Sequence, residues 1–297
     1  MKKKFVAIML TMSMVAALAG CGNSKGEETA AQDTTASEAA VSDMAASETP
    51  AEDTAQSATE EGKVYKVGIV QYVDDASLNQ IEKSIEAELT AKGEELGVTF
   101  DFADYTHNGQ ADSTVLNQIA TDLVADQVDV IIPIATPAAM IMQNATEDNQ
   151  IPVVFSAVSD PVGAGLVASA DAPGANITGT SDAIDTEAIF KLIVAANPDT
   201  AKVGLLYDKS QAGSIQSIED AKAYCDANGI TYVEKTGTTT AEVQAAADAL
   251  VAEQVDAVFT PQDNTIMTAE LAIFEKFTEA GIPHYTGADS FALNGAF

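Results

Sequence analysis

A set of short sequence patterns occurs twice along the chain in the same order, and this constrains the fold more than any other feature. The paired strings are VGIV at 67–70 and VGLL at 203–206, GVTF at 97–100 and GITY at 229–232, LVADQVD at 123–129 and LVAEQVD at 250–256, and IP at 151–152 and 282–283. Their offsets are 136, 132, 127 and 131 residues. Such repetition is typical of one structural unit present twice. The alternative is chance similarity between generic α/β segments, but the glycines and the Gln-Val-Asp triplet fall in register.

Short apolar runs alternate with helical periodicity throughout both copies. In the first copy the strand patterns are 67–70, 98–102, 128–134 and 152–155, and the helical patterns are 78–96, 113–125 and 137–146. Gly97 directly follows the first helical pattern and is expected to end that helix. Alternation of strands and helices predicts an α/β fold with a parallel sheet covered on both faces.

The duplication divides the folded region into two doubly wound parallel-sheet lobes with a hinge between them. We predict an N-terminal lobe at 64–175, a hinge crossover at 176–185 and a C-terminal lobe at 186–297. Gly174 and Gly179 are suited to absorb backbone rotation at the hinge. Open α/β sheets bind ligands at the carboxyl ends of their strands, so we expect a ligand cleft between the lobes.

The first twenty residues have the organisation of a signal peptide. Lys2, Lys3 and Lys4 precede an apolar stretch at 5–19 that is short for a membrane span, and Ala19 and Gly20 precede Cys21. This pattern predicts cleavage before Cys21 and lipidation of its thiol; the alternative is a buried helix that ends in a chance cysteine. Residues 22–62 contain ten acidic residues and one lysine, so we predict that 21–63 is the lipidated cysteine followed by a disordered acidic tether. The protein would then lie outside the cytoplasmic membrane, held there by the lipid anchor alone.

Composition excludes several classes of function. The chain has 45 acidic residues against 14 lysines, no arginine and a net charge of −31, which argues against nucleic-acid binding. Two cysteines and two histidines leave little for a disulfide framework or a zinc site. Phosphate-loop, dinucleotide and nucleophile-elbow motifs are missing, so we predict a binding protein without a cofactor rather than an enzyme. The enzyme alternative would need a base and a nucleophile that converge in the cleft.

Several strings resemble the ABC transporter substrate-binding lipoproteins of the tryptophan/tyrosine type, the ABC_sub_bind family. They are GIVQY at 68–72, IATPAA at 134–139, PVVFSAVSDPVGAGLV at 152–167, NITGTSD at 176–182 and PQDNT at 261–265. The resemblance implies a type I periplasmic-binding-protein fold and a monomer that delivers a small solute, often an aromatic amino acid, to an ABC permease. Members of this family run on past the segment at 287–290, so we expect C-terminal elements to be missing beyond Phe297. The alternatives are a sensor or adhesin with the same fold, or a ligand that is not an amino acid.

Candidate ligand-binding residues follow from the chemistry of an amino acid. Because arginine is absent, the ligand's carboxylate needs hydroxyls and backbone N–H groups at helix N-termini, which Thr136, Ser156 and Ala157 can supply. Thr136 could instead be only a helix cap. Lobe 2 offers Asp263 and Asp289 for the ammonium group; the alternatives are an Asx turn for Asp263 and a helix cap for Asp289.

The remaining candidates concern the ligand's side chain and the hinge. Tyr72 is the expected stacking partner of a ring, with Gln71 as an amide partner, and Tyr207 could close the opposite wall. Further polar contacts are expected from Asn264, Thr265, Thr180 and Ser181.

Overall fold

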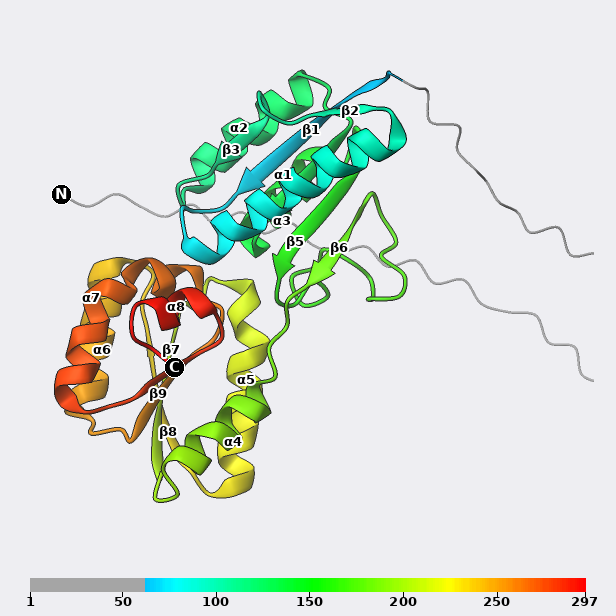
Figure 1. Ribbon diagram of the computed structural model, residues 1–297. Helices are drawn as coiled ribbons and strands as arrows, with labels where there is room; N and C mark the ends of the chain where they lie inside the picture. Colours follow the sequence, from blue (N-terminus) through cyan, green and yellow to red (C-terminus); the bar gives the residue numbers. More distant parts are fainter. Residues whose placement is uncertain (1–61) are drawn as a thin grey trace, which may run out of the picture. The chain divides into compact units, whose positions relative to one another are not determined.

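Two separate parallel sheets form the framework of the protein in the computed structural model, which describes residues 62–297 (Figure 1). The first sheet has the strand order β2-β1-β4-β5-β6, with β3 also paired to β1; the second has the order β10-β9-β7-β8. The predicted signal peptide, Cys21 and the tether up to residue 61 lie outside the described residues. Two separate sheets confirm the predicted fold class of two α/β lobes.

The strands and helices alternate along the chain as the sequence predicts. In the first lobe they are β1 (Val64–Gln71), α1 (Ala76–Leu96), β2 (Thr99–Asp101), β3 (Thr106–Asn108), α2 (Ser113–Ala125), β4 (Val130–Ile134), α3 (Thr136–Thr146), β5 (Val153–Val158) and β6 (Ile177–Ser181). In the second lobe they are α4 (Thr186–Ala196), β7 (Lys202–Tyr207), α5 (Ala212–Asn228), β8 (Thr231–Thr236), α6 (Thr240–Ala252), β9 (Ala257–Thr260), α7 (Asn264–Ala280), β10 (His284–Thr286) and α8 (Asp289–Leu293).

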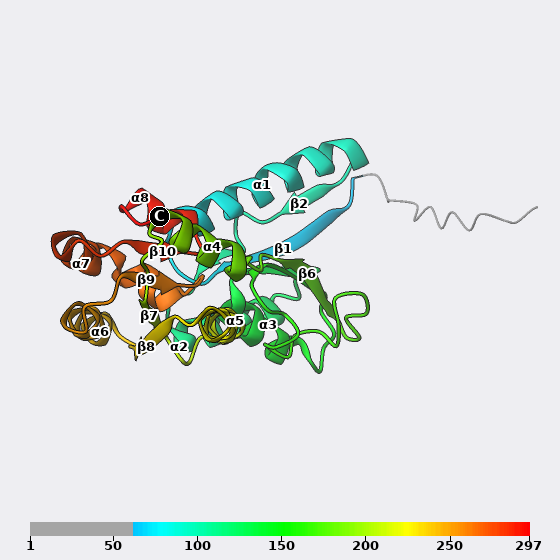
Figure 2. The same cartoon turned by 90° about the horizontal axis from the view of Figure 1, so that it is seen from below.

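Each sheet is covered by helices on both faces, which buries most residues of its inner strands, whereas the edge strands β6 and β8 stay largely accessible to solvent. In the first lobe α1 packs on one face with Val67 and Ile69, and α2 and α3 pack on the other face around Leu116 and Met142. Figure 2 shows α1 on one side of β1 and β2, and α2 and α3 on the other. In the second lobe α4 and α5 cover one face, and α6 and α7 cover the other.

The internal duplication extends to individual contacts between strands and helices. The amide N–H of Lys66 donates to Asp129, and that of Lys202 donates to Asp256, each at 2.8 Å. The Nζ atoms of the same lysines donate to the backbone carbonyls of Asp126 and Glu253. These contacts hold the turn before β4 against β1, and the turn before β9 against β7, in the same way.

Glycine and glutamine of the repeated strings also have equivalent roles. Gln127 and Gln254, the first residues of the two Gln-Val-Asp triplets, both have positive φ, at 52° and 54°. Gly97 and Gly229 end α1 and α5 in the left-handed conformation, with φ of 68° and 70°. The predicted end of the helix at Gly97 is therefore confirmed. Glycine is favoured at this position because residues with a side chain rarely adopt a positive φ.

Two details of the first sheet differ from the sequence prediction, and a third is an irregularity in its strand pairing. β3 was not predicted. It has only three residues, which are too few to form a strand pattern, and they pair with the last three residues of β1. Residues 177–181, which we assigned to the hinge crossover at 176–185, form β6 and pair with β5, so only 182–185 connect the lobes. Pro133 lies in β4, an inner strand of the sheet, and the paired positions with β5 are only Ile131 with Val153 and Ile134 with Ser156. Proline has no N–H for the ladder, which accounts for the gap.

None of the described helices between residues 62 and 297 is long and apolar enough to cross a membrane.

The equivalent glycines of β1 and β7 yield a test of the duplicated packing. A Cβ atom at Gly68 would come within 2.9 Å of a methyl group of Leu123, and one at Gly204 within 2.8 Å of a methyl group of Leu250. We expect Gly68→Ala and Gly204→Ala each to lower the free energy of unfolding by about 1–3 kcal/mol through overpacking. Chemical denaturation monitored by circular dichroism measures this loss.

Double-mutant cycles identify the obstructing side chain. In a Leu123→Ala background, Gly68→Ala should cost much less than in the wild type, and Leu250→Ala should rescue Gly204→Ala likewise. Equal losses in both backgrounds would show that neither leucine is the obstacle.

Candidate ligand-binding cleft

A cavity of about 360 Å³ lies between the two lobes at the carboxyl ends of their strands. The first lobe and the connection contribute Ser77, Leu78, Ile81, Ala135, Thr136, Ala157, Ser159 and Asp182. The second lobe contributes Gln211, Gly213, Gln262, Asn264, Met267, Gly287, Ala288 and Asp289. Cavities of this size at strand ends of α/β sheets are the usual binding sites for small ligands.

The first turns of four long helices stand around this cavity, and they differ in how they are capped. Asp75 caps α1 by accepting from the N–H groups of Ser77 and Leu78, and Asp263 caps α7. By contrast, α3 and α5 have no side-chain cap at Ala135 or Gln211. Uncapped helix N-termini carry partial positive charge and free N–H groups, so α3 and α5 leave the cavity with a capacity to bind an anion.

The N-termini of α3 and α5 approach each other across the cleft. A Cβ atom at Gly213 of α5 would lie 3.0 Å from Oγ1 of Thr136 and 3.5 Å from Oγ of Ser159. Thr136 is buried, with 5% of its surface exposed. A glycine at this position of α5 therefore lets two hydroxyls of the first lobe come close to the second.

Two alanines at neighbouring strand ends have backbone conformations that are unusual for residues with a Cβ atom. Ala135, after β4, has φ 80° and ψ 153°, and Ala157, near the end of β5, has φ 54°. Both line the cavity. Such conformations cost on the order of 1–3 kcal/mol each and are found where a binding site needs a particular direction of the backbone.

Asp263 lies in the second lobe with its hydrogen-bonding capacity already used. It is 1% exposed, and its Oδ2 accepts from Asp208 N and Ser214 Oγ, both at 2.8 Å. Its Oδ1 accepts from the N–H groups of Thr265 and Ile266 at 3.0 Å. Burial raises the pKa of Asp263 to about 6 in spite of these donors. The structure therefore places this predicted ligand-binding residue as a helix cap behind the cavity wall.

Asp289 stands at the cavity edge and joins the two lobes. Its Oδ1 accepts a hydrogen bond from Ser77 Oγ of α1 at 2.6 Å, and the same Ser77 Oγ accepts from Ser290 N at 3.1 Å. Asp289 also lines an adjoining surface hollow together with Ser156. Its side chain is therefore available to a ligand in the cavity, although it is largely exposed to solvent.

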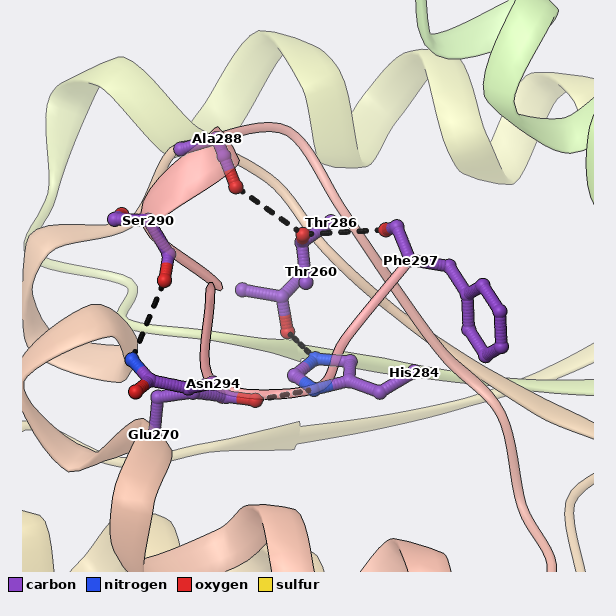
Figure 3. Close-up of polar contacts among 8 residues, drawn as sticks. All are labelled: Thr260, Glu270, His284, Thr286, Ala288, Ser290, Asn294 and Phe297. Atoms are coloured by element: carbon purple, nitrogen blue, oxygen red, sulfur yellow. Dashed lines mark hydrogen bonds and ion pairs between the residues drawn. The ribbon is translucent and has the colours of Figure 1, made fainter. Parts of the chain in front are cut away.

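A buried polar network under α8 holds the segment that carries Asp289 (Figure 3). His284 lies between Thr260 Oγ1, 2.9 Å from its Nε2, and Glu270 Oε1, 3.3 Å from its Nδ1. The backbone of His284 and Thr286 pairs with Phe297. His284 is thus a structural residue of the second lobe.

Asp182 stands in the cavity wall on the connection between the lobes. Its Oδ2 accepts from Gln262 Nε2 at 3.0 Å, and its backbone N–H donates to Val158 O. Its Oδ1 is buried and has no hydrogen-bond partner. Burial raises the pKa of this carboxyl, and the hydrogen bond from Gln262 opposes the rise.

The three predicted residues for the ligand's side chain occupy different places. Gln71 is 1% exposed and donates to Asn79 Oδ1, which ties β1 to α1. Tyr72 is half-buried beside Gln211; burial raises its pKa and a hydrogen bond with Gln211 opposes the rise. Tyr207 is buried in the core between β7, α4 and α5, and its hydroxyl donates to Glu234 at 2.7 Å. None of these three is among the residues that line the cavity.

The remaining predicted residues lie at or near the rim. Asn264 lines the cavity and donates to Gln211, whereas Thr265 lies behind it and donates to Asp208. Thr180 and Ser181 are exposed on β6, and Ser181 Oγ donates to Ser159 O. Four predicted residues thus line the cavity, namely Thr136, Ala157, Asn264 and Asp289.

Sequence reasoning missed the polar residues that bridge the lobes. Ser159 Oγ donates to Gln262 Oε1 at 3.2 Å, which links the residue directly after β5 of the first lobe to the loop after β9. Ser77 and Gln211 were missed as well. Serine and glutamine next to helix starts carry no distinctive signal, although Ser159 and Gln262 both fall inside strings that resemble the substrate-binding family.

The comparisons with known proteins agree with this architecture. The family model described as ABC transporter substrate binding protein matches residues 66–297. A tyrosine-binding protein of Clostridioides difficile (strain R20291) is 33% identical over 240 residues, which is 80% of this chain and 68% of that protein. The match to the family model includes both lobes and all the residues that line the cavity.

Two solved structures of similar identity differ in how well they superpose. The ABC domain from Streptococcus pneumonia in complex with L-Trp is 31% identical, with a TM-score of 0.72 over 79% of this chain and 77% of that one. The ligand-free, open structure of a substrate-binding protein with adhesive properties from Clostridium difficile is also 31% identical, with a TM-score of 0.56 over 78% and 77%. From the family match over both lobes and these relatives, we conclude that the chain belongs to the family of ABC transporter substrate-binding proteins.

Proposed function

We propose that this protein binds an aromatic α-amino acid in the cavity between its lobes and presents it to an ABC permease. The observation that carries the proposal is the pairing, in one cavity, of two uncapped helix N-termini with acidic side chains. A zwitterion has the complementary charges, an anionic carboxylate and a cationic ammonium group. The tyrosine-binding relative and the L-Trp complex support an aromatic side chain.

The carboxylate is assigned to the N-termini of α3 and α5. No arginine is present in the sequence, and of the described residues none that lines the cavity is a lysine. The anion must therefore be held by backbone N–H groups and by hydroxyls such as those of Thr136 and Ser159. Gly213 contributes by keeping the space between the two helix ends open.

The ligand's side chain is assigned to the apolar part of the cavity. Leu78 and Ile81 of α1 and Met267 of α7 line it, and Met267 packs against the apolar cluster of the first lobe. Methionine sulfur makes favourable contacts with aromatic rings, and aliphatic side chains exclude water from them. This arrangement suits a ring without requiring an aromatic stacking partner.

Lobe closure around the ligand is the proposed signal to the permease. Hydrogen bonds of Ser77 to Asp289 and of Ser159 to Gln262 cross the cleft. The better superposition on the L-Trp complex than on the open structure supports a closed arrangement. If closure depends on the ligand, the permease can distinguish the closed, ligand-bound form of the protein from its open, ligand-free form.

Direct binding measurements test the ligand class. Isothermal titration of the mature protein should show binding of L-tryptophan or L-tyrosine, with tryptamine and tyramine at least about tenfold weaker because they lack the carboxylate. The unfolding temperature of the protein should rise with the concentration of the amino acid, because the ligand binds only the folded state. Stabilisation by a sugar or a nucleoside, and by no aromatic amino acid, would refute the assignment.

A matched pair of variants on α5 tests the position of the site. Gly213→Val would place a branched side chain against Thr136 and should weaken amino-acid binding at least about tenfold. Ala223→Val, on the exposed face of the same helix, should leave the affinity unchanged. Equal affinities of both variants would place the ligand elsewhere.

Anchoring through Cys21 is a separate part of the proposal. The string before Cys21 supports lipidation of its thiol with a diacylglycerol, whose two acyl chains would anchor the protein stably at a membrane. We expect Cys21→Ser to move the protein from the membrane fraction to the soluble fraction of the producing cells and to abolish labelling by a radioactive fatty acid. Ser24→Ala serves as the control, and continued membrane recovery of unlabelled Cys21→Ser would argue against a lipid anchor.

A further inference from the structure

A buried carboxylate oxygen in the wall of the cavity lacks any partner. Among residues 62–297, three buried side-chain atoms make no hydrogen bond: Asp182 Oδ1, Thr186 Oγ1 and Glu270 Oε2. Of these three residues, Asp182 alone lines the cavity between the lobes. Because a desolvated carboxylate oxygen without a donor is unfavourable, its presence at this place requires an explanation.

The rest of the Asp182 side chain is held firmly from both lobes. Oδ2 accepts from Gln262 Nε2 of the second lobe at 3.0 Å, and Oε1 of the same glutamine accepts from Ser159 Oγ of the first lobe at 3.2 Å. The backbone N–H of Asp182 donates to Val158 O at 3.2 Å. The carboxyl group is therefore fixed in position, and Oδ1 is its free end.

The protein itself offers no cation to this carboxylate. No lysine is among the described residues that line the cavity, and Asp182 takes part in none of the ion pairs of the described chain. Burial accordingly raises the pKa of the Asp182 carboxyl, and no positively charged neighbour lowers it. A bound ligand with a cationic group would supply the charge that these protein residues do not.

The other two candidate carboxylates are less suited to receive a cation. Both oxygens of Asp263 already accept two hydrogen bonds each behind the cavity wall. Asp289 is exposed to solvent and accepts from Ser77. A charge pair is weaker at an exposed position than at a desolvated one, so Asp182 is the stronger site.

Ser159 links Asp182 to the region assigned to the carboxylate. Its hydroxyl lies near the open N-terminus of α5 at Gly213, and it is connected to Asp182 through Gln262, to which both are hydrogen-bonded. An α-amino acid carries its ammonium and carboxylate on one carbon atom, so it needs an acceptor and an anion site side by side. The cavity provides this arrangement around Ser159.

We propose that Asp182 binds the ammonium group of the ligand through Oδ1 and thereby selects α-amino acids over their des-amino analogues. The inference rests on the proposed function, and it adds the residue that recognises the amino group. Asp182→Asn keeps the shape of the side chain and an oxygen for Gln262 but removes the charge.

Calorimetric titration of the wild type, Asp182→Asn and Asp289→Asn tests the proposal. The probes are L-tryptophan and L-tyrosine with their des-amino analogues, indole-3-propionate and 3-(4-hydroxyphenyl)propionate. Loss of a charged hydrogen bond predicts that Asp182→Asn binds the amino acid about 10- to 100-fold more weakly than the wild type does. The affinity of Asp182→Asn for the des-amino analogue should stay within about threefold of the wild-type value.

The unfolding temperature separates ligand recognition from a structural role. Because the ligand-free protein carries a desolvated charge at Asp182, ligand-free Asp182→Asn should unfold at the same or a higher temperature than the wild type. A structural residue would give the opposite shift. Lower stability of Asp182→Asn with equal losses for both ligand types would overturn the proposal.

Failure of the inference is distinct from failure of the proposed function. If the wild type binds an aromatic amino acid and only Asp289→Asn loses affinity for it, Asp289 recognises the ammonium group and the assignment to Asp182 is wrong. If the wild type binds no aromatic amino acid, the proposed function itself is wrong, and the assignment to Asp182 falls with it.

Discussion

The cleft closes without a cationic side chain, and this electrostatic constraint governs how the site can work. Three described helices lack side-chain caps, α3, α5 and α8, and the N-termini of all three line the cavity. With no arginine in the sequence and no lysine among the described residues of the cavity wall, backbone N–H groups at these ends are the proposed partners of an anion. The same constraint leaves Asp182 without a partner for Oδ1. Both parts of the proposed zwitterion site, for the carboxylate and for the ammonium group, therefore reflect the lack of a cationic side chain among the described residues of the cavity wall.

The sequence predicts the framework well because the relevant interactions are local or repeated. The positive φ of Gln127 and Gln254 and the contacts of Asp129 and Asp256 lie within the strings that repeat. Each such string contains both a turn and the start of a strand, so the local sequence pattern is sufficient to predict the local structure. The limits of the prediction are also local. β3 has only three residues, and β6 lies in a mostly polar segment around Gly179 that we assigned to the hinge.

The binding site was less predictable, because the role of a polar side chain depends on partners far along the chain. Asp263 follows a strand, as a ligand-binding residue would, but its acceptor capacity is filled by Asp208 and Ser214, about fifty residues away. Tyr207 follows the same pattern and points into the core toward Glu234. The importance of Asp182 depends on Gln262, which is 80 positions away, and on the absence of a lysine nearby. Neither fact can be read from the residues around Asp182.

The unpartnered carboxylate also bears on how closure could depend on the ligand. In a closed lobe arrangement without ligand, Asp182 loses water and gains no cation, which opposes closure by an amount on the order of a few kcal/mol. When the lobes are apart, water can solvate Oδ1 and this penalty disappears. A ligand that brings an ammonium group removes the penalty from the closed state alone, and a ligand shifts an equilibrium by its differential affinity for the two states. Because Gln262 of the second lobe bonds to both Asp182 and Ser159 of the first, the residue that we propose recognises the ligand is also at the point where the lobes meet. Recognition and closure are then consequences of the same desolvated charge.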